Sequence, residues 1–344
     1  MRVERNFDLS GRNTFGMKVV CGTYVEYSSS TELSGLDFDS FPKPWLHIGA
    51  GSNLLFEGDF HGTVFHSDIK YIKYVDMGLD EVPVAVGAGV VFDDFVADVC
   101  RNGLWGAENL SLIPGEVGAA AVQNIGAYGV EVKDIISGVV CYDTLEHRKV
   151  TFKTSECDYS YRHSMFKDPS SKGRYIVTSV LFRVSRKYSP KLEYKGILSA
   201  LEGQTPQTPQ QVRDAVIGIR REKLPDPAVT GSAGSFFKNP VIGREQFSRI
   251  LEIAKKDGVE EVPHFDLPGA QVKLPAAWMI EQCGFKGFRL GNAAVYEKQP
   301  LVIVNFTGEA SPKEIIELEN MITGAVRDKY GIVLSPEVEH VKSE

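Results

Sequence analysis

The sequence contains no apolar run long enough to cross a membrane and no cluster of basic residues. A membrane helix needs roughly 18 or more consecutive apolar residues, and no stretch of the 344 residues approaches that length. Nucleic-acid binding relies on lysine and arginine that neutralise phosphates, whereas this chain has a formal net charge of −7. The first residues, MRVERNFDLS, lack the apolar core of a secretory signal. We therefore expect a cytoplasmic protein that binds neither membranes nor nucleic acid.

Cysteine is scarce, and no metal-binding motif is present. The five cysteines are scattered without a CxxC pair, which indicates reduced thiols rather than a disulfide framework. The seven histidines form neither HExxH nor a zinc-finger spacing with cysteine, so we expect no metal site. The sequence has no GxxxxGK[ST] motif, and GSAGS at residues 231–235 does not match GxSxG. These absences argue against a P-loop nucleotide site and a serine hydrolase.

The predicted elements indicate an α+β protein with a strand-rich first half and a more helical second half. Since single cores rarely grow past about 250 residues, we expect two or three domains. Short strands fill the first 70 residues, and apolar residues at helical spacing predict a helix within 90–103. Later strands are predicted at 82–86, 135–143, 148–154, 175–184, 301–306 and 332–341, and later helices at 210–223, 245–258, 275–284 and 311–331.

Glycine is abundant, with 33 residues, and it is concentrated in a few segments. GAGSNLLF at 49–56 has the composition of an anion-binding turn, with Ser52 and Asn53 as extra donors. Gly87-Ala88-Gly89 follows a predicted strand as a dinucleotide fingerprint would, but Phe92 occupies the third glycine position. Each segment taken alone is equally compatible with an ordinary hairpin turn.

The segment IPGEVGAAAVQNIGAYGVEV, residues 113–132, is a more specific signal. It forms a loop rich in glycine and alanine around Gln123 and Asn124. Small residues let a backbone lie against a flat ligand, and the two amides supply donors and acceptors. This composition favours a bound nucleotide or flavin.

Three polar groups of residues remain, and each has an ordinary structural interpretation. Arg162 lies among aromatic residues in YRHSMFK, where surface ion pairs would explain it. Ser235 lies in GSAGSFFKNP, downstream of Lys223, and a turn serine would explain it. Glu337 lies in LSPEVE at the start of the last predicted strand, where an exposed strand end would explain it. Taken singly, each ordinary interpretation is favoured.

Taken together, these motifs resemble the UDP-N-acetylenolpyruvoylglucosamine reductase family, flavoenzymes of peptidoglycan precursor synthesis. The resemblance runs from NTFGMKV at residue 13 to PEVE at 336–339. Its signatures are GAGSNLLF, PGEVGAAAVQNIGAYG, YRHSMFK, KLPDP, GSAGSFFKNP and SPEV, in this order. The resemblance implies a two-lobed FAD-binding domain of the vanillyl-alcohol-oxidase type and a C-terminal α/β substrate-binding domain.

The resemblance also implies the domain limits and the ligands. The FAD-binding lobes are expected at 1–70 and 71–210, and the substrate-binding domain at 211–344. FAD is expected to bind non-covalently, NADPH to supply electrons, and a UDP-sugar to be the substrate of a monomeric enzyme. The residues expected to contact FAD are Gly49, Ala50, Gly51, Ser52, Asn53, Leu54, Pro114, Gly115, Gly118, Ala119, Gln123, Asn124, Gly126 and Tyr128.

In such an enzyme the flavin would pass a hydride to the enolpyruvyl group. The family's catalytic residues correspond to Arg162, Glu337 and the proton donor Ser235. A forked guanidinium suits the delocalised anion that the hydride leaves behind, and a serine can protonate an enolate in a dry site. Residues expected to contact the substrate are Tyr194, Lys223, Asn239 and Gln299, with Tyr194 on a loop near 188–200 that defines one subclass.

The chain departs from the family pattern at two places. His264 and Phe265 occupy the region where the family carries a substrate-binding tyrosine, and Ala119–Ala121 stand where relatives often carry serines. Two other functions remain open. One is a flavin oxidase that uses O₂ on the same fold, and the other is a non-catalytic module that binds a sugar nucleotide or flavin.

Overall fold

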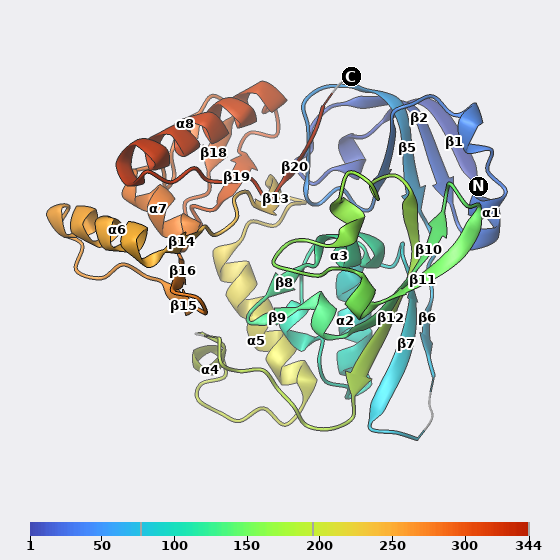
Figure 1. The fold of residues 1–344 in the computed structure, drawn as a ribbon, viewed down its shortest axis with the longest axis horizontal. Helices are drawn as coiled ribbons and strands as arrows, with labels where there is room; N and C mark the ends of the chain where they lie inside the picture. The colour runs from blue at the N-terminus through green and yellow to red at the C-terminus, as the bar shows by residue number, and fades with distance from the viewer. Residues whose placement is uncertain (76–77, 195, 343–344) are drawn as a thin grey trace.

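The computed structural model describes residues 1–75, 78–194 and 196–342 and has mixed helix and strand content (Figure 1). A four-stranded sheet in the order β1-β2-β5-β3 forms the N-terminal part. β2 pairs antiparallel with β1 but parallel with β5, which also pairs parallel with β3. The strands are β1 (Arg2–Asp8), β2 (Val20–Tyr27), β3 (Trp45–Ile48) and β5 (Phe60–Ser67), and the short helix α1 (Ser30–Ser34) follows β2.

A second, five-stranded antiparallel sheet has the order β11-β10-β12-β7-β6. Helix α2 packs on it through the apolar face predicted from sequence, with Phe95 stacked on Phe182 at 4.4 Å between ring centroids. The elements are β6 (Ile72–Tyr74), β7 (Glu81–Gly87), α2 (Phe92–Arg101), β10 (Ile136–Asp143), β11 (Arg148–Lys153) and β12 (Tyr175–Ser185). Helices α4 (Ile197–Ala200) and α5 (Pro209–Lys223) follow, and α5 contacts α2.

The C-terminal part contains two small sheets and three helices, orange to red in Figure 1. The last helix shows the predicted capping box between Ser311 and Glu314 and ends at Gly331 with φ of 67°. The elements are β13 (Gly231–Ser235), β14 (Val241–Gly243), α6 (Arg244–Lys256), β15 (Phe265–Leu267), β16 (Gln271–Lys273), α7 (Ala276–Gln282), β17 (Arg289–Leu290), β18 (Ala293–Val295), β19 (Val302–Asn305) and α8 (Pro312–Tyr330).

Two predictions about local structure were wrong. The predicted loop after residue 113 contains a helix, α3 (Val117–Gln123), because alanine has the highest helix propensity and three alanines fall inside it. It is followed by a two-strand hairpin of β8 (Gly126–Ala127) and β9 (Val130–Glu131). The strand predicted at 332–341 is only β20 (Glu339–Val341), which pairs parallel with β4 (Leu54–Phe56). The chain end thus returns to the glycine-rich turn near residue 50.

The hydrophobic cores do not follow the order of the sequence. One cluster joins residues of the N-terminal sheet, such as Tyr24, to residues of the C-terminal part, such as Phe236 and Ile303. The buried members of a second cluster all lie between Val82 and Val184. The domain limits at residues 70 and 210 stay a prediction. No helix within the described residues is long and apolar enough to cross a membrane.

Candidate active site

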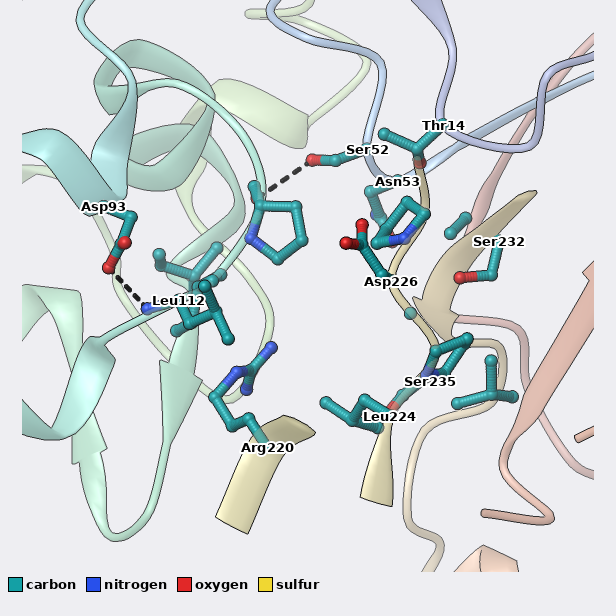
Figure 2. A pocket seen from close by; sticks show the side chains of 18 of the residues that line it. Thr14, Ser52, Asn53, Asp93, Leu112, Arg220, Leu224, Asp226, Ser232 and Ser235 are labelled. Atoms are coloured by element: carbon teal, nitrogen blue, oxygen red, sulfur yellow. Dashed lines mark hydrogen bonds between the residues drawn. The ribbon is translucent and has the colours of Figure 1, made fainter. Parts of the chain in front are cut away.

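A cavity of about 570 Å³ lies between segments that are far apart in the sequence. Its volume falls within the range of about 300–1,000 Å³ that is usual for ligand pockets. Figure 2 shows Leu112 and Arg220 on one side of it and Thr14 and Ser235 on the other. We call it the main cavity.

The three residues expected to be catalytic, Arg162, Ser235 and Glu337, all line the main cavity. The Arg162 guanidinium donates to Glu337 Oε1 at 2.5 Å and to the carbonyl of Gly126 at 2.7 Å. The Glu337 backbone N–H donates to the carbonyl of Phe236 at 2.8 Å. Glu337 is therefore fixed between the arginine and the residue that follows Ser235.

Burial dominates the electrostatics of Glu337. Its side chain is 12% exposed, and burial raises the pKa of this carboxyl although the adjacent Arg162 acts to lower it. The carboxyl consequently holds its proton at a higher pH than an exposed glutamate does. A group of this kind in a cavity is a candidate for proton exchange with a ligand.

Ser235 reaches the cavity because of an irregularity in β13. The pairing of β13 with β19 shifts register between Ser232 and Ser235, and Gly234 between them has φ of 71°. This left-handed conformation favours glycine, and a local bulge of this kind redirects the side chain that follows. Ser235 is half-buried, and the described part of the chain gives its hydroxyl no hydrogen-bond partner.

A second cavity of about 190 Å³ shares Ser52, Asn53, Pro114, Gln123 and Ile125 with the main cavity. Most of the residues expected to contact FAD line one or both of these two spaces. Gly126 lines the main cavity. Gly49, Gly51, Leu54, Gly115, Gly118 and Ala119 line the second, in addition to the shared residues.

Two glycines at the second cavity are required by contacts inside the protein. A Cβ on Gly51, whose φ is 66°, would lie 2.1 Å from the carbonyl oxygen of Arg12. A Cβ on Gly118 would lie 2.9 Å from the Cβ of Ala88. The glycine-rich segments therefore allow close packing of neighbouring backbones, a reason that the sequence argument about a flat ligand did not include.

Unpartnered polar atoms at the walls provide a test of whether FAD fits. Thr14 Oγ1, Gln123 Nε2 and Arg220 Nε line the main cavity, are buried, and lack a hydrogen-bond partner in the described chain. At the second cavity, His47 Nε2 is likewise buried without a hydrogen-bond partner in the described chain. Burial lowers the pKa of His47 to about 3. Buried polar groups in native proteins normally have partners. A large polar ligand such as FAD fits these walls.

Three of the expected FAD contacts, Ala50, Asn124 and Tyr128, line neither cavity within the described residues. Asn124 is buried and ends α3 with φ of 47°. Its side chain donates to the carbonyl of Ser160 at 2.7 Å and accepts from the N–H of Lys133 at 3.3 Å. The structure thus gives the Asn124 amide a role within the chain, which the sequence argument did not foresee.

The four expected substrate residues lie outside the two cavities as described. Tyr194 is 45% exposed and packs edge-on against Tyr128 at 5.2 Å between ring centroids; residue 195 of its loop is outside the described residues. Lys223 is the exposed last residue of α5, directly before the cavity residue Leu224. The Asn239 side chain accepts from the first N–H of α7 at 2.9 Å. Gln299 is in the turn before β19, where its side chain accepts from the N–H of Leu301 at 3.4 Å.

Several residues at the site were not singled out from the sequence. Arg220, one helical turn before Lys223, is half-buried at the main cavity, and desolvation of its guanidinium lowers its pKa. Asp93 accepts from the N–H of Leu112 at 2.5 Å and from both terminal nitrogens of Arg213, at 2.6 and 2.9 Å. No motif marks Asp93 and Arg213 as a pair, because 120 residues separate them. The described residues contain no group of three or more His, Cys, Asp or Glu side chains placed to hold a metal ion.

Comparison with known proteins decides the family. Residues 226–341 match the family model of the UDP-N-acetylenolpyruvoylglucosamine reductase C-terminal domain, and residues 38–145 match an FAD binding domain. The UDP-N-acetylenolpyruvoylglucosamine reductase of Bacteroides fragilis is 48% identical over 98% of this chain and all of its own length. The protein of the same name from Porphyromonas gingivalis is 44% identical over 99% of this chain and its full length. The chain belongs to the UDP-N-acetylenolpyruvoylglucosamine reductase family.

A solved structure supports the fold of this reductase family member. The crystal structure of UDP-N-acetylenolpyruvylglucosamine reductase from Thermus caldophilus is 24% identical, covers 99% of both chains and gives a TM-score of 0.68. The expected α+β class, with an FAD-binding domain and the reductase C-terminal domain, is confirmed. The protein is a flavin-dependent oxidoreductase with FAD as its cofactor. Its assignment to the subclass with the tyrosine loop stays a prediction.

Proposed function

We propose that this protein reduces UDP-N-acetylglucosamine enolpyruvate to UDP-N-acetylmuramate in peptidoglycan precursor synthesis, with NADPH as electron donor. The observation that carries the proposal is the convergence of Arg162, Ser235 and Glu337 on one cavity. Relatives at 44–48% identity carry the name of this reductase over their full length. We place the enzyme in the cytoplasm as a monomer.

FAD held by these walls would supply the redox chemistry, which is hydride transfer from NADPH to the terminal methylene carbon of the substrate. The hydride leaves negative charge on the neighbouring carbon and its carboxylate. Arg162, held by Glu337 and Gly126, directs a permanent positive charge into the cavity where that charge develops. Glu337, whose pKa burial raises, donates a hydrogen bond to the same anion when it is protonated.

Ser235 then gives its hydroxyl proton to the carbon that bears the carboxylate, and the serine regains a proton from solvent. Its hydroxyl has no competing partner in the described chain, so it is available to the substrate. A general acid of this kind contributes typically about 10²–10⁴-fold to the rate. Lys223 assists by stabilising the serine oxygen after it loses the proton, and with Tyr194, Asn239 and Gln299 it binds the sugar nucleotide.

The walls of the two cavities hold FAD through the eleven expected residues that line them, with Thr14, His47 and Arg220 added by the structure. The phosphates carry negative charge, and backbone N–H groups in the Gly49–Leu54 turn are suitable donors to them.

Two measurements test this function. The purified protein is expected to be yellow and to release all of its flavin on acid precipitation, because the binding is non-covalent. Anaerobic NADPH should bleach the flavin, and the enolpyruvyl sugar nucleotide should restore its absorption with formation of UDP-N-acetylmuramate. Reoxidation by O₂ alone, with no response to the sugar nucleotide, would instead identify an oxidase. A flavin that NADPH cannot reduce would indicate a binding module.

A further inference from the structure

Lys167 joins the catalytic arginine to the glutamine that lines both cavities. Its ammonium donates to Gln123 Oε1 at 2.6 Å and to the backbone carbonyl of Arg162 at 3.4 Å. Gln123 lines both the main and the second cavity. Arg162 has φ of 55°, an uncommon conformation for a residue other than glycine. A single cation thus contacts both parts of the site.

The lysine dictates the orientation of the Gln123 amide. An ammonium group has three donors and no acceptor, so only the amide oxygen can face it. The amide nitrogen must then point away from Lys167, and Gln123 Nε2 is buried without a partner in the described chain. Gln123 lines both cavities, and its amide nitrogen lies buried in that shared wall with two unpaired donor hydrogens.

Other contacts hold the lysine in this place. Ser164 donates to the carbonyl of Val122 at 2.5 Å, and Asn124 donates to the carbonyl of Ser160 at 2.7 Å. These bonds fasten the segment 160–167 to the end of α3. Burial, followed by the charge of Lys238, lowers the pKa of Lys167. Placing a cation in such surroundings is unfavourable, which argues that its contacts serve a purpose.

We propose that Lys167 is a positioning residue for the cofactor. It fixes the Gln123 amide in the wall that the two cavities share, and through the Arg162 carbonyl it fixes the backbone that carries the catalytic guanidinium. Lys167 does not contact the ligand itself. The inference rests on FAD binding by this family and is independent of the sugar-nucleotide substrate.

The test measures the dissociation constant of FAD for the refolded or stripped apoprotein by quenching of flavin fluorescence. Lys167→Met should weaken FAD binding roughly 5- to 50-fold, the scale expected when a buried amide loses its fixed partner. Gln123→Ala should weaken it by a similar factor. Adding Lys167→Met to Gln123→Ala should change the constant by no more than about 2-fold, because two residues that act as a unit are not additive.

Two further variants separate positioning from charge. Lys167→Gln removes the charge but keeps a donor for Gln123 Oε1, so it should recover part of the lost affinity. Lys286→Met removes an exposed cation that pairs with Glu281, and because neither residue lines a cavity it should leave FAD binding within about 2-fold. The visible spectrum of bound flavin should shift in Lys167→Met and not in Lys286→Met, because only the former frees the Gln123 amide.

Several outcomes would overturn the proposal. Additive effects of Lys167→Met and Gln123→Ala, or equal losses in Lys167→Gln and Lys167→Met, would show that Lys167 acts through its charge. A lowered melting temperature of apo Lys167→Met with unchanged FAD affinity would show a purely structural role. If Lys167→Met fails to fold, Lys167→Gln still decides. Its effect on FAD affinity should disappear when Gln123→Ala is also present, and an equal loss with and without Gln123→Ala would contradict positioning. Failure of the parent protein to bind FAD would count against the family function rather than this role.

Discussion

The two sides of the main cavity differ in how firmly their side chains are held. On one side, which we call the braced side, two hydrogen bonds fix the segment 112–126 (Figure 2). The Leu112 N–H donates to Asp93, and the Ser52 hydroxyl donates to the Pro114 carbonyl at 3.1 Å. On the other, which we call the open side, Ser235 is left without a side-chain partner among the described residues. We group with the open side Tyr194, which lies outside both cavities on an exposed loop and whose hydroxyl makes no hydrogen bond to another described residue.

This difference matches the two kinds of ligand that the proposed function requires. A cofactor that stays bound benefits from a wall that is rigid before it arrives, because little ordering remains to oppose binding. A substrate that enters and leaves in each cycle needs polar groups that are free to bond with it. We therefore expect changes on the open side to alter turnover while sparing stability, and changes on the braced side to do the reverse.

The largest effect is expected from Ser235→Ala on the open side. NADPH should still bleach the flavin at close to the parent rate in stopped-flow mixing, since hydride transfer to FAD needs no proton from Ser235. Reoxidation by the enolpyruvyl substrate should slow by roughly 10²–10⁴-fold, the usual scale for a lost general acid. The melting temperature should stay near that of the parent.

Cysteine at this position is the matched control for Ser235→Ala. Ser235→Cys keeps a donor of similar size with an ordinary pKa of about 8.5, so part of the lost rate should return if proton donation is the role. The alternative is that Ser235 only shapes the bulge before Phe236. Turnover of Ser235→Ala near the parent value would support that alternative and end the assignment of Ser235 as proton donor.

On the braced side, Arg213→Met should cost stability. The variant leaves Asp93 partly buried without its bidentate partner, which should lower the free energy of unfolding by about 2–3 kcal/mol. Urea unfolding of the apoprotein measures this. Arg249→Met, which breaks an exposed pair with Glu245 on α6, should change it by less than about 1 kcal/mol. Equal losses of unfolding free energy in the two variants would show that the Asp93–Arg213 pair contributes no more to stability than a surface ion pair.

The stability that the Asp93–Arg213 ion pair contributes should also depend on pH. Burial acts to raise the pKa of Asp93, but hydrogen bonds from Arg213 and from the Leu112 N–H lower it overall. A carboxyl whose pKa is lower in the folded state adds stability above its unfolded pKa of about 3.9, and this is lost as the pH falls through the folded value.

Melting temperatures across this acid range test the pH dependence. The difference in melting temperature between the parent protein and Asp93→Asn should be largest near neutral pH and should decrease as the pH falls below about 4. Asp94→Asn, at an exposed neighbouring position, should show no such decrease. A difference that stays constant with pH would mean that the Asp93 charge does not stabilise the fold.

The same contrast explains what the sequence could predict. Short contiguous motifs singled out Arg162, Ser235 and Glu337, which the structure brings to one cavity, because each motif keeps its own residues together in the sequence. The helix α8 was predicted from its capping box, which is a local signal. By contrast, the pairing of Asp93 with Arg213 and of Lys167 with Gln123 depends on tertiary packing between segments that no local pattern links. The helix α3 was missed because its alanines were interpreted as ligand-facing loop residues.

The smallest effect is expected from Tyr194→Phe on the open side. Phenylalanine keeps the ring against Tyr128, so the loop should retain its place and only the hydroxyl is removed. Loss of one hydrogen bond to the substrate should raise the apparent KM for the sugar nucleotide roughly 2- to 10-fold, while NADPH reduction of the flavin stays unchanged. Tyr188→Phe is the matched control, since its exposed ring packs on Trp105 in the same segment, and it should leave KM at the parent value. Equal damage to both half-reactions in Tyr194→Phe would make this loop part of the braced side, and the division of the cavity would have to be redrawn.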